Sequence, residues 1–567
     1  MAESPLSTGA DGAAPYPFDL GSFHRATSTS SPGAQRWFNR GLTWTYGFNH
    51  EEAVRCFEHA VALDGHFALA HWGLAYAAGP NYNKQWDAFD EEDLRTSLRR
   101  AHEASARAHR LAVTAPPIEQ ALARALTRRF AAPEAGSEDE LQRWAAEYAS
   151  AMGEVYAGYG EDLDVAALYA DALMNLTPWA LWDLSTGAPA EGARTLEIRE
   201  VLDTALGRPG GMEHPGLLHL YLHLLEMSPH PEQALAAANA LRGLVPDAGH
   251  LVHMPTHIDV LLGDFERVIE DNERAIVADE RYAEVAGRVS FYALYRAHDH
   301  HFRIYGAMFA GRRATALAAA ADLAAALPED LLRVESPPMA DWLESFVPMR
   351  LHVLVRFGLW EEILAEPLPE DRALYRVTTA LTHYAKGVAH AALAQVGEAE
   401  RERERFSAAV LEVPDTRYLF NNQARDLLAI AAAMLEGEIE YRAGNYDAAW
   451  AGLRRAIELD DSLPYDEPWG WMQPTRHAYG ALLLEQGEIE SAAAVYAADL
   501  GFDATLARAC QHPNNVWSLH GYHECLLRLG RAEEAAEIGP QLERALSRAD
   551  VDITSSCYCR MHARSSP

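Results

Sequence analysis

The feature that most restricts the fold of this chain is a regular alternation of helical segments and short turns. Segments of about 12–15 residues rich in Ala, Leu, Glu and Arg are separated by Gly, Asp or Pro, and strand patterns are scarce. In the clearest pair, Trp37, Gly41 and Trp44 share one helix, and Ala53 and Phe57 share the next. Small residues let two helices approach closely, and aromatic rings fill the space between successive pairs. The sequence therefore predicts an array of antiparallel helix pairs.

The spacing of these residues resembles the tetratricopeptide-repeat (TPR) pattern, W-x2-L-G-x2-Y followed by A-x3-F-x2-A and a turn residue. The first unit is formed by Trp37, Gly41, Trp44, Ala53, Phe57, Ala60 and the turn residue Gly65. Later units contain Gly437, Gly444, Tyr446, Ala449 and Ala456, then Gly480, Gly487, Ala492 and Tyr496, and more loosely Gly530, Ala532 and Ala535. Turn residues Gly263, Gly311, Gly358 and Gly397 continue the rhythm between them. The resemblance covers most of residues 35–540 and implies an all-α class, an α-solenoid of antiparallel helix pairs forming a superhelix.

The rhythm and composition predict five regions along the chain. These are a flexible N-terminal arm (1–30), TPR-like repeats (31–130), degenerate repeats with a histidine-rich groove (143–330), C-terminal repeats (331–540) and a tail (541–567). Residues 130–142 and 460–475 have the composition of insertions or linkers.

The charge of the chain argues against two classes of partner. With 48 Lys and Arg against 82 Asp and Glu, the formal net charge is −34, which repels nucleic acid and anionic lipid. No apolar run approaches the roughly 18 residues that a membrane helix needs, and the N-terminal segment lacks a secretory pattern. Five scattered cysteines form no disulfide framework. We therefore expect a cytoplasmic protein without a nucleic-acid or membrane partner, in which Cys557, Cys559 and His562 are either a soft-metal site or inert.

A pair of histidines four residues apart occurs twice in the chain at an interval of 34 residues. His219 and His223 recur as His253 and His257. Residues three, four or seven apart lie on one helical face, so each set converges on that face. In the TPR family the first helix of each pair lines the groove at fixed positions. The resemblance therefore implies that a larger set faces the groove, namely His219, His223, His250, His253, His257, His298, His301 and, near the C-terminus, His520.

Clustered neutral imidazoles predict a transition-metal site. Copper, zinc, iron or nickel suits imidazole ligands, whereas calcium and magnesium prefer oxygen. Zinc with three histidines is the simplest option, but the number of imidazoles favours two ions, or one ion beside substrate-binding histidines. Facing helix-borne H-x3-H pairs are also similar to dicopper oxygen sites, without a full match to those families. The competing interpretations are a polar or pH-sensitive ligand groove and isolated structural histidines.

Two classes of function follow from this pattern. The first is a metal-dependent enzyme, with copper favoured and zinc or iron as alternatives, that acts on a small-molecule substrate as an oxidoreductase or, less readily, a hydrolase. Glu226, Tyr305 and Glu524 are its candidate catalytic residues, because they share the predicted groove. The second is a non-catalytic TPR scaffold that binds a peptide or partner protein.

Overall fold

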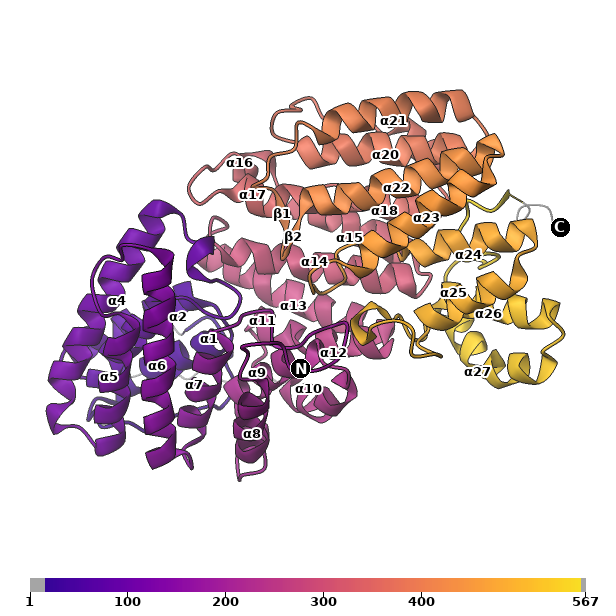
Figure 1. Cartoon of the computed structure of the whole chain (residues 1–567). Helices are drawn as coiled ribbons and strands as arrows, with labels where there is room; N and C mark the ends of the chain where they lie inside the picture. The colour runs from indigo at the N-terminus through magenta and orange to yellow at the C-terminus, as the bar shows by residue number, and fades with distance from the viewer. Residues whose placement is uncertain (1–15, 562–567) are drawn as a thin grey trace, which may run out of the picture.

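The fold is an all-α solenoid of antiparallel helix pairs, as the computed structural model of residues 16–561 shows (Figure 1). The predicted fold class is confirmed. The N-terminal third, the central third and the C-terminal third follow one another across the molecule, and the helices of the central third lie between the other two (Figure 1). Among the described residues the strands are limited to one short hairpin, β1 (Tyr418–Leu419) paired antiparallel with β2 (Asn422–Gln423).

The helices of the three regions follow the order of the chain. The N-terminal region contains α1 (Pro32–Tyr46), α2 (His50–Leu63), α3 (Ala68–Ala78), η1 (Trp86–Ala88), α4 (Glu91–Leu111), η2 (Ala112–Thr114), α5 (Pro117–Arg129), α6 (Glu138–Tyr159) and α7 (Leu163–Met174). The central region contains α8 (Thr195–Leu206), η3 (Gly211–Glu213), α9 (Pro215–Glu226), η4 (Pro231–Ala234), α10 (Leu235–Leu241), α11 (Gly249–His253), α12 (Pro255–Leu262), α13 (Phe265–Ala286), α14 (Tyr292–Phe309) and α15 (Arg313–Ala326). The C-terminal region contains α16 (Glu329–Leu332), α17 (Met339–Leu343), η5 (Glu344–Phe346), α18 (Met349–Arg356), α19 (Trp360–Ala365), α20 (Arg376–Ala392), α21 (Val396–Val410), α22 (Ala424–Ala443), α23 (Tyr446–Asp461), α24 (Thr475–Gln486), α25 (Ile489–Asp499), η6 (Arg508–Cys510), α26 (Val516–Arg528) and α27 (Ala532–Arg548).

Glycines end several of the helices where the repeat rhythm predicts a turn. Gly263, Gly444 and Gly487 follow α12, α22 and α24 with φ of 74°, 82° and 84°, a left-handed conformation that glycine adopts without a Cβ clash. One predicted turn residue is displaced. Gly397 lies inside the first helical turn of α21. The residue with left-handed dihedral angles in the connection between α20 and α21 is Ala394, with φ of 59°.

Phe57 of α2 packs against two glycines of the neighbouring helices, which explains the close approach in the first helix pair. The ring is fully buried, and a Cβ added at Gly41 would lie 2.7 Å from it. Gly73 of α3 faces the same ring. This contact joins α1, α2 and α3 into one packing unit.

Substitution of Gly41 is expected to disturb this packing. We expect Gly41→Ala to lower the free energy of unfolding by about 1–3 kcal/mol, because the enclosed Phe57 ring has no room to move. Gly158→Ala in α6 is the matched control, since no atom lies within 4 Å of its added Cβ. The control should instead gain about 0.5–1 kcal/mol from helix propensity. Chemical denaturation of both variants measures the difference, and a Gly41 variant as stable as the control would contradict the packing argument.

The two ends of the described chain pack against the helices. Arg25 lies 2.7 Å from both Asp162 and Asp164, so the segment before α1 is anchored on the start of α7. The predicted flexible arm thus includes a docked part, and its residues 1–15 lie outside the described residues. The tail after α27 returns to the helices, where the Arg356 guanidinium donates to the carbonyl of Ser556. Residues 562–567, and with them His562, lie outside the described residues.

A search for membrane spans found none: over residues 16–561, every helix is too short or too polar to cross a bilayer.

Candidate metal centre

Four helices of the central region bring six of the predicted histidines together. His219 and His223 come from α9, His250 and His253 from α11, His257 from α12 and His298 from α14. We call these six residues the histidine cluster. They are between 0% and 6% exposed, so they lie in the interior of the solenoid and not on an open concave surface.

A proline divides the second pair of histidines between two helices. Because Pro255 has no backbone N–H, the helical hydrogen bonding is interrupted between α11 and α12, although Met254 between them keeps right-handed helical dihedral angles. His257 nevertheless faces His253, and their Nε2 atoms are 2.7 Å apart. The four-residue spacing therefore brings the two rings together even though the predicted single helix is broken.

The first triad consists of His219, His223 and His250. Each offers a ring nitrogen, and these three atoms lie within 4.8 Å of one another. His219 Nδ1 donates to the carbonyl of Tyr46 at 2.6 Å, and His223 Nδ1 donates to Glu226 Oε1 at 2.8 Å. These bonds fix the protons on Nδ1. The buried Nε2 lone pairs of His219 and His223 have no hydrogen-bond partner among the described residues, so they are available to a metal ion.

The second triad consists of His253, His257 and His298, whose ligand atoms also lie within 4.8 Å of one another. His253 Nδ1 is 2.6 Å from Asn272 Oδ1 and 3.2 Å from Asp299 Oδ1. These contacts hold the imidazole of His253 in place through the nitrogen that faces away from the triad.

Glu226 connects the two triads. Its Oε1 accepts from His223 Nδ1 and its Oε2 accepts from His257 Nδ1, each at 2.8 Å. Glu467, from the loop between α23 and α24, contacts the same nitrogen of His257. A single carboxylate therefore orients one ligand in each triad, the arrangement by which proteins commonly hold metal-binding histidines.

Burial keeps every imidazole of the cluster neutral at pH 7. It lowers the pKa of His219 to about 3 and that of His253 to about 4. Burial also lowers the pKa values of the remaining four well below the ordinary histidine value. Neutral imidazole is the form that binds metal ions, so these side chains need not lose a proton to act as ligands.

Several carboxyl groups are buried beside the cluster. Burial, reinforced by the charge of Glu467, raises the pKa of Glu226 well above its ordinary value. Burial likewise raises the pKa of Glu467 to about 8, and burial with the charge of Asp279 raises that of Asp299. Buried carboxylates are costly unless a cation balances them. A metal ion in either triad would supply that positive charge.

Aromatic side chains enclose the cluster, and three of them have a strained backbone. Phe48, Trp179 and Phe420 have φ of 55°, 56° and 48°, a conformation that bulky residues rarely adopt. Their rings lie 4.3 Å from His219, 5.6 Å from His223 and 4.3 Å from His298, respectively, measured between ring centroids. Each such backbone costs on the order of 1–3 kcal/mol and is typical of functional sites.

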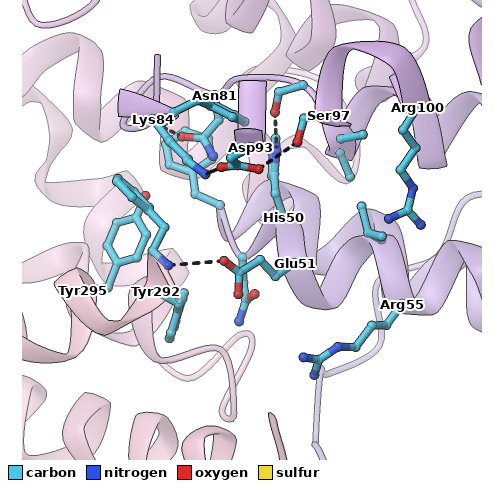
Figure 2. A pocket seen from close by; sticks show the side chains of 18 of the residues that line it. His50, Glu51, Arg55, Asn81, Lys84, Asp93, Ser97, Arg100, Tyr292 and Tyr295 are labelled. Carbon is cyan, nitrogen blue, oxygen red and sulfur yellow. Dashed lines mark hydrogen bonds and ion pairs between the residues drawn. The ribbon is translucent and has the colours of Figure 1, made fainter. Parts of the chain in front are cut away.

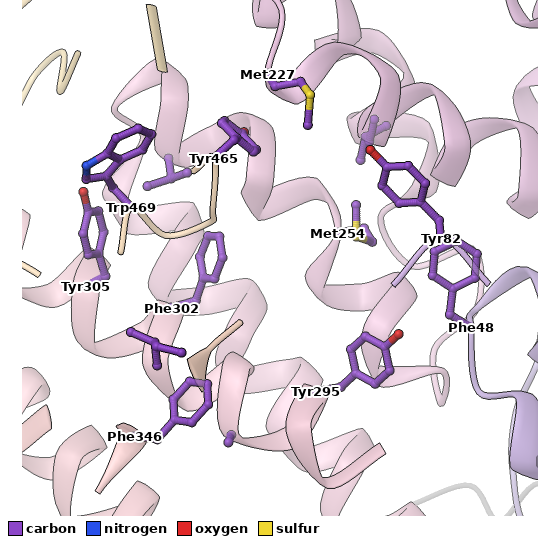
Figure 3. Close-up of a cluster of buried hydrophobic side chains, with 14 of the residues drawn as sticks. Phe48, Tyr82, Met227, Met254, Tyr295, Phe302, Tyr305, Phe346, Tyr465 and Trp469 are labelled. Atoms are coloured by element: carbon purple, nitrogen blue, oxygen red, sulfur yellow. The ribbon is translucent and has the colours of Figure 1, made fainter. Parts of the chain in front are cut away.

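The aromatic enclosure differs at the two triads. Phe302 packs on all three rings of the second triad, at 4.7–5.2 Å between centroids. Phe48, Tyr82 and Tyr295 form a separate group of rings at the first triad (Figure 3).

Four predicted site residues lie apart from the histidine cluster. His301 Nε2 is 2.8 Å from Met472 Sδ, outside both triads. Tyr305 stacks on Phe309 at 4.3 Å. On α26, Glu524 pairs with Arg560 at 2.7 Å, which lowers the pKa of its carboxyl, and His520 is a weaker contributor to the same shift.

Other residues that contact the cluster were absent from the sequence prediction. Asp299 is next to His298 in the sequence, and Asp466 and Glu467 form an acidic pair in the linker at 460–475, so both offered a signal. Asn272 and Phe48 carried none, because an asparagine in a polar helix and a phenylalanine in a turn have no distinctive pattern.

The remaining cysteine motif forms a separate feature in the tail. Cys557 and Cys559 are joined by a disulfide, whereas Cys56, Cys510 and Cys525 are free and buried. A carboxylate oxygen of Glu438 lies within 4.8 Å of both sulfurs, but in a disulfide these sulfurs are not the thiolates that bind a metal ion.

Comparison with known proteins gives limited similarity. No protein-family model matches the sequence, and no curated protein matches it. The solved structure described as "Structure of Naa15/Naa10 bound to HypK-THB" is similar, with a TM-score of 0.20, 13% identity, and coverage of 91% of this chain and 70% of that chain. The crystal structure of the yeast Tom70 is similar with a TM-score of 0.26, 10% identity, and coverage of 91% and 99%.

Proposed function

We propose that the histidine cluster binds two transition-metal ions, one in each triad, and that the protein is a metal-dependent enzyme acting on a small molecule. The observation that carries this proposal is the grouping of the ligand atoms of each triad within 4.8 Å, deep in the interior. Three protein ligands leave a further coordination position open, as in catalytic metal sites. The bridging position of Glu226 supports two neighbouring ions over one.

Copper is the favoured metal, with zinc or iron as alternatives. The triads offer imidazole nitrogen only, a donor that suits all three metals, and copper binds most tightly in the general affinity order. The aromatic enclosure limits the access of water, which suits oxidation chemistry at a copper pair. An oxidoreductase is therefore the favoured class, with a metal-assisted hydrolase as the alternative.

Metal analysis of the purified full-length chain tests this proposal. After loading with copper and removal of excess metal, we expect two copper ions per chain by elemental analysis. Loading with zinc and with iron under the same conditions serves as the comparison for metal identity. A protein that retains no transition metal from any of the three would overturn the proposal.

A peptide-binding scaffold is a second candidate, favoured by a cationic cavity between α20 and α21. This cavity of about 640 Å³ is lined by Arg372, Arg376, Lys386 and Arg405, in a chain whose net charge is strongly negative. Glu412 pairs with Arg376 and Glu402 with Arg405, so Arg372 and Lys386 supply the surplus positive charge of the cavity. Permanent positive charges of this kind hold carboxylates. Binding of an acidic peptide that Lys386→Glu abolishes would support this function, and it would do so independently of the metal content.

A further inference from the structure

A cavity of about 450 Å³ lies beside the first triad, between α2, α3, α4 and α14. Its wall includes His50, Ser97, Tyr292 and Tyr295, and Arg55 and Arg100 lie on one side of it (Figure 2). The size is that of a cavity for a small molecule.

One layer of aromatic rings separates this cavity from the first triad. Phe48 lines the cavity and its ring lies 4.3 Å from that of His219. Tyr295 lines it as well, and its ring lies 4.5 Å from that of His250. A molecule in the cavity therefore reaches the imidazoles of the first triad if the Phe48 ring turns aside.

The backbone of Phe48 indicates that its placement has a functional reason. Gly47 ends α1, and the Asn49 side chain accepts from the backbone N–H of Glu52 at the start of α2, which leaves Phe48 as the single residue that reverses the chain. Its φ of 55° is a conformation that glycine adopts without strain. The chain instead keeps a large ring there, over all three histidines of the first triad.

The lining of the cavity indicates the class of molecule that it accepts. Five Phe and Tyr rings line the wall beside polar side chains such as Asn81 and Ser97, which suits a flat aromatic ligand that carries a polar group. The cations around the wall already have acidic partners: Lys84 lies 2.8 Å from Asp93, Arg55 lies 3.2 Å from Glu52, and Arg100 pairs with Glu58. Within the wall itself the three basic side chains are matched by three acidic ones, Glu51, Glu58 and Asp93, so an uncharged ligand fits best.

We infer that this cavity is the entrance to the first triad, that it admits a small uncharged aromatic molecule, and that Phe48 closes it. The inference rests on the proposed function, since it names the substrate class of that site. It also concerns a physical route to the histidines, which exists in the metal-free protein.

Chemical modification of the metal-free full-length protein tests the route. Diethyl pyrocarbonate modifies neutral imidazoles, and mass spectrometry locates the modified residues. Phe48→Gly should raise the rate of modification at the first triad on the order of tenfold, because the ring no longer has to open. Glycine suits the left-handed φ at this position, so this variant keeps the backbone conformation.

Further variants separate this route from general loosening of the fold. Addition of Ser97→Trp to Phe48→Gly should restore the slow rate by filling the cavity, whereas Ala408→Trp, in the cavity between α20 and α21, should not. Phe420→Gly is the matched control, since it removes an equally strained ring from His298 and should leave the first triad protected. Phenol should slow modification in Phe48→Gly, and its charged relative benzoate should not.

Unchanged modification of the first triad in Phe48→Gly, or equal protection by phenol and benzoate, would overturn the inference. Copper uptake by the same samples is measured separately. If the protein binds no copper but Phe48→Gly still raises the rate of modification at the first triad, the metal function is overturned and the route to the histidines stands.

Discussion

Replacement of one histidine in either triad is expected to remove one metal ion and leave the other bound. His250→Ala should empty the first triad and His298→Ala the second, so each variant should retain one copper ion and the double variant none. Loss of a direct ligand should cost more affinity than the roughly 10–100-fold that follows loss of a group that only orients a ligand. Elemental analysis after dialysis measures the stoichiometry.

These two histidines are chosen because the metal-free structure makes little use of them. Within residues 16–561, both ring nitrogens of His250 and Nδ1 of His298 have no hydrogen-bond partner. Helicity should therefore stay close to that of the unsubstituted chain. His352→Ala is the matched control, since His352 is 5% exposed and packs on Trp471, outside both triads. Retention of both ions by His250→Ala, or loss of metal by the control, would show that the triads are not the binding sites.

The fold was largely predictable because its determinants are local. Gly41 and Phe57, which pack against each other, belong to one helix pair. Glycines end α12, α22 and α24 in the same way. Such residues recur from pair to pair and leave a repeating pattern in the sequence. The displaced turn at Ala394 is an exception, because a left-handed alanine carries no sequence signal.

The grouping of the six histidines was also predictable, whereas their surroundings were not; their role as metal ligands stays a prediction. Helical spacing placed His219 and His223 on one face, and the 34-residue interval placed His253 and His257 beside them. The contact of Glu467 with His257 spans more than 200 residues and depends on how the solenoid bends. The same holds for Phe48, whose role follows from its backbone conformation and not from its residue type.

Substitution of Glu226 by Gln is expected to lower the affinity of both triads for metal ions. No single histidine substitution should do this. Glu226 accepts from one histidine in each triad, and a carboxamide has only one oxygen to do so. The NH₂ group of the substituted side chain would face the Nδ1–H of the other histidine, so two donors would meet. That imidazole would have to turn away, or move its proton to Nε2, the nitrogen that the metal ion needs. The negative charge that balances the ions is lost as well.

The expected loss of copper affinity is roughly 10–100-fold at each triad, or about 1.4–2.7 kcal/mol, measured by competition with a chromophoric chelator. The metal-free protein should be almost as stable as before, because glutamine keeps the shape of Glu226 and removes a buried charge that burial and the charge of Glu467 already disfavour, as the raised pKa of Glu226 indicates. Glu344→Gln is the matched control, with a fully buried carboxylate that accepts from the backbone N–H groups of Val377 and Thr378 at the start of α20. That variant should lose stability and keep its metal affinity. If Glu226→Gln lowers the copper affinity of only one triad, the carboxylate does not connect the two triads. If the substitution unfolds the metal-free protein, the role of Glu226 is structural.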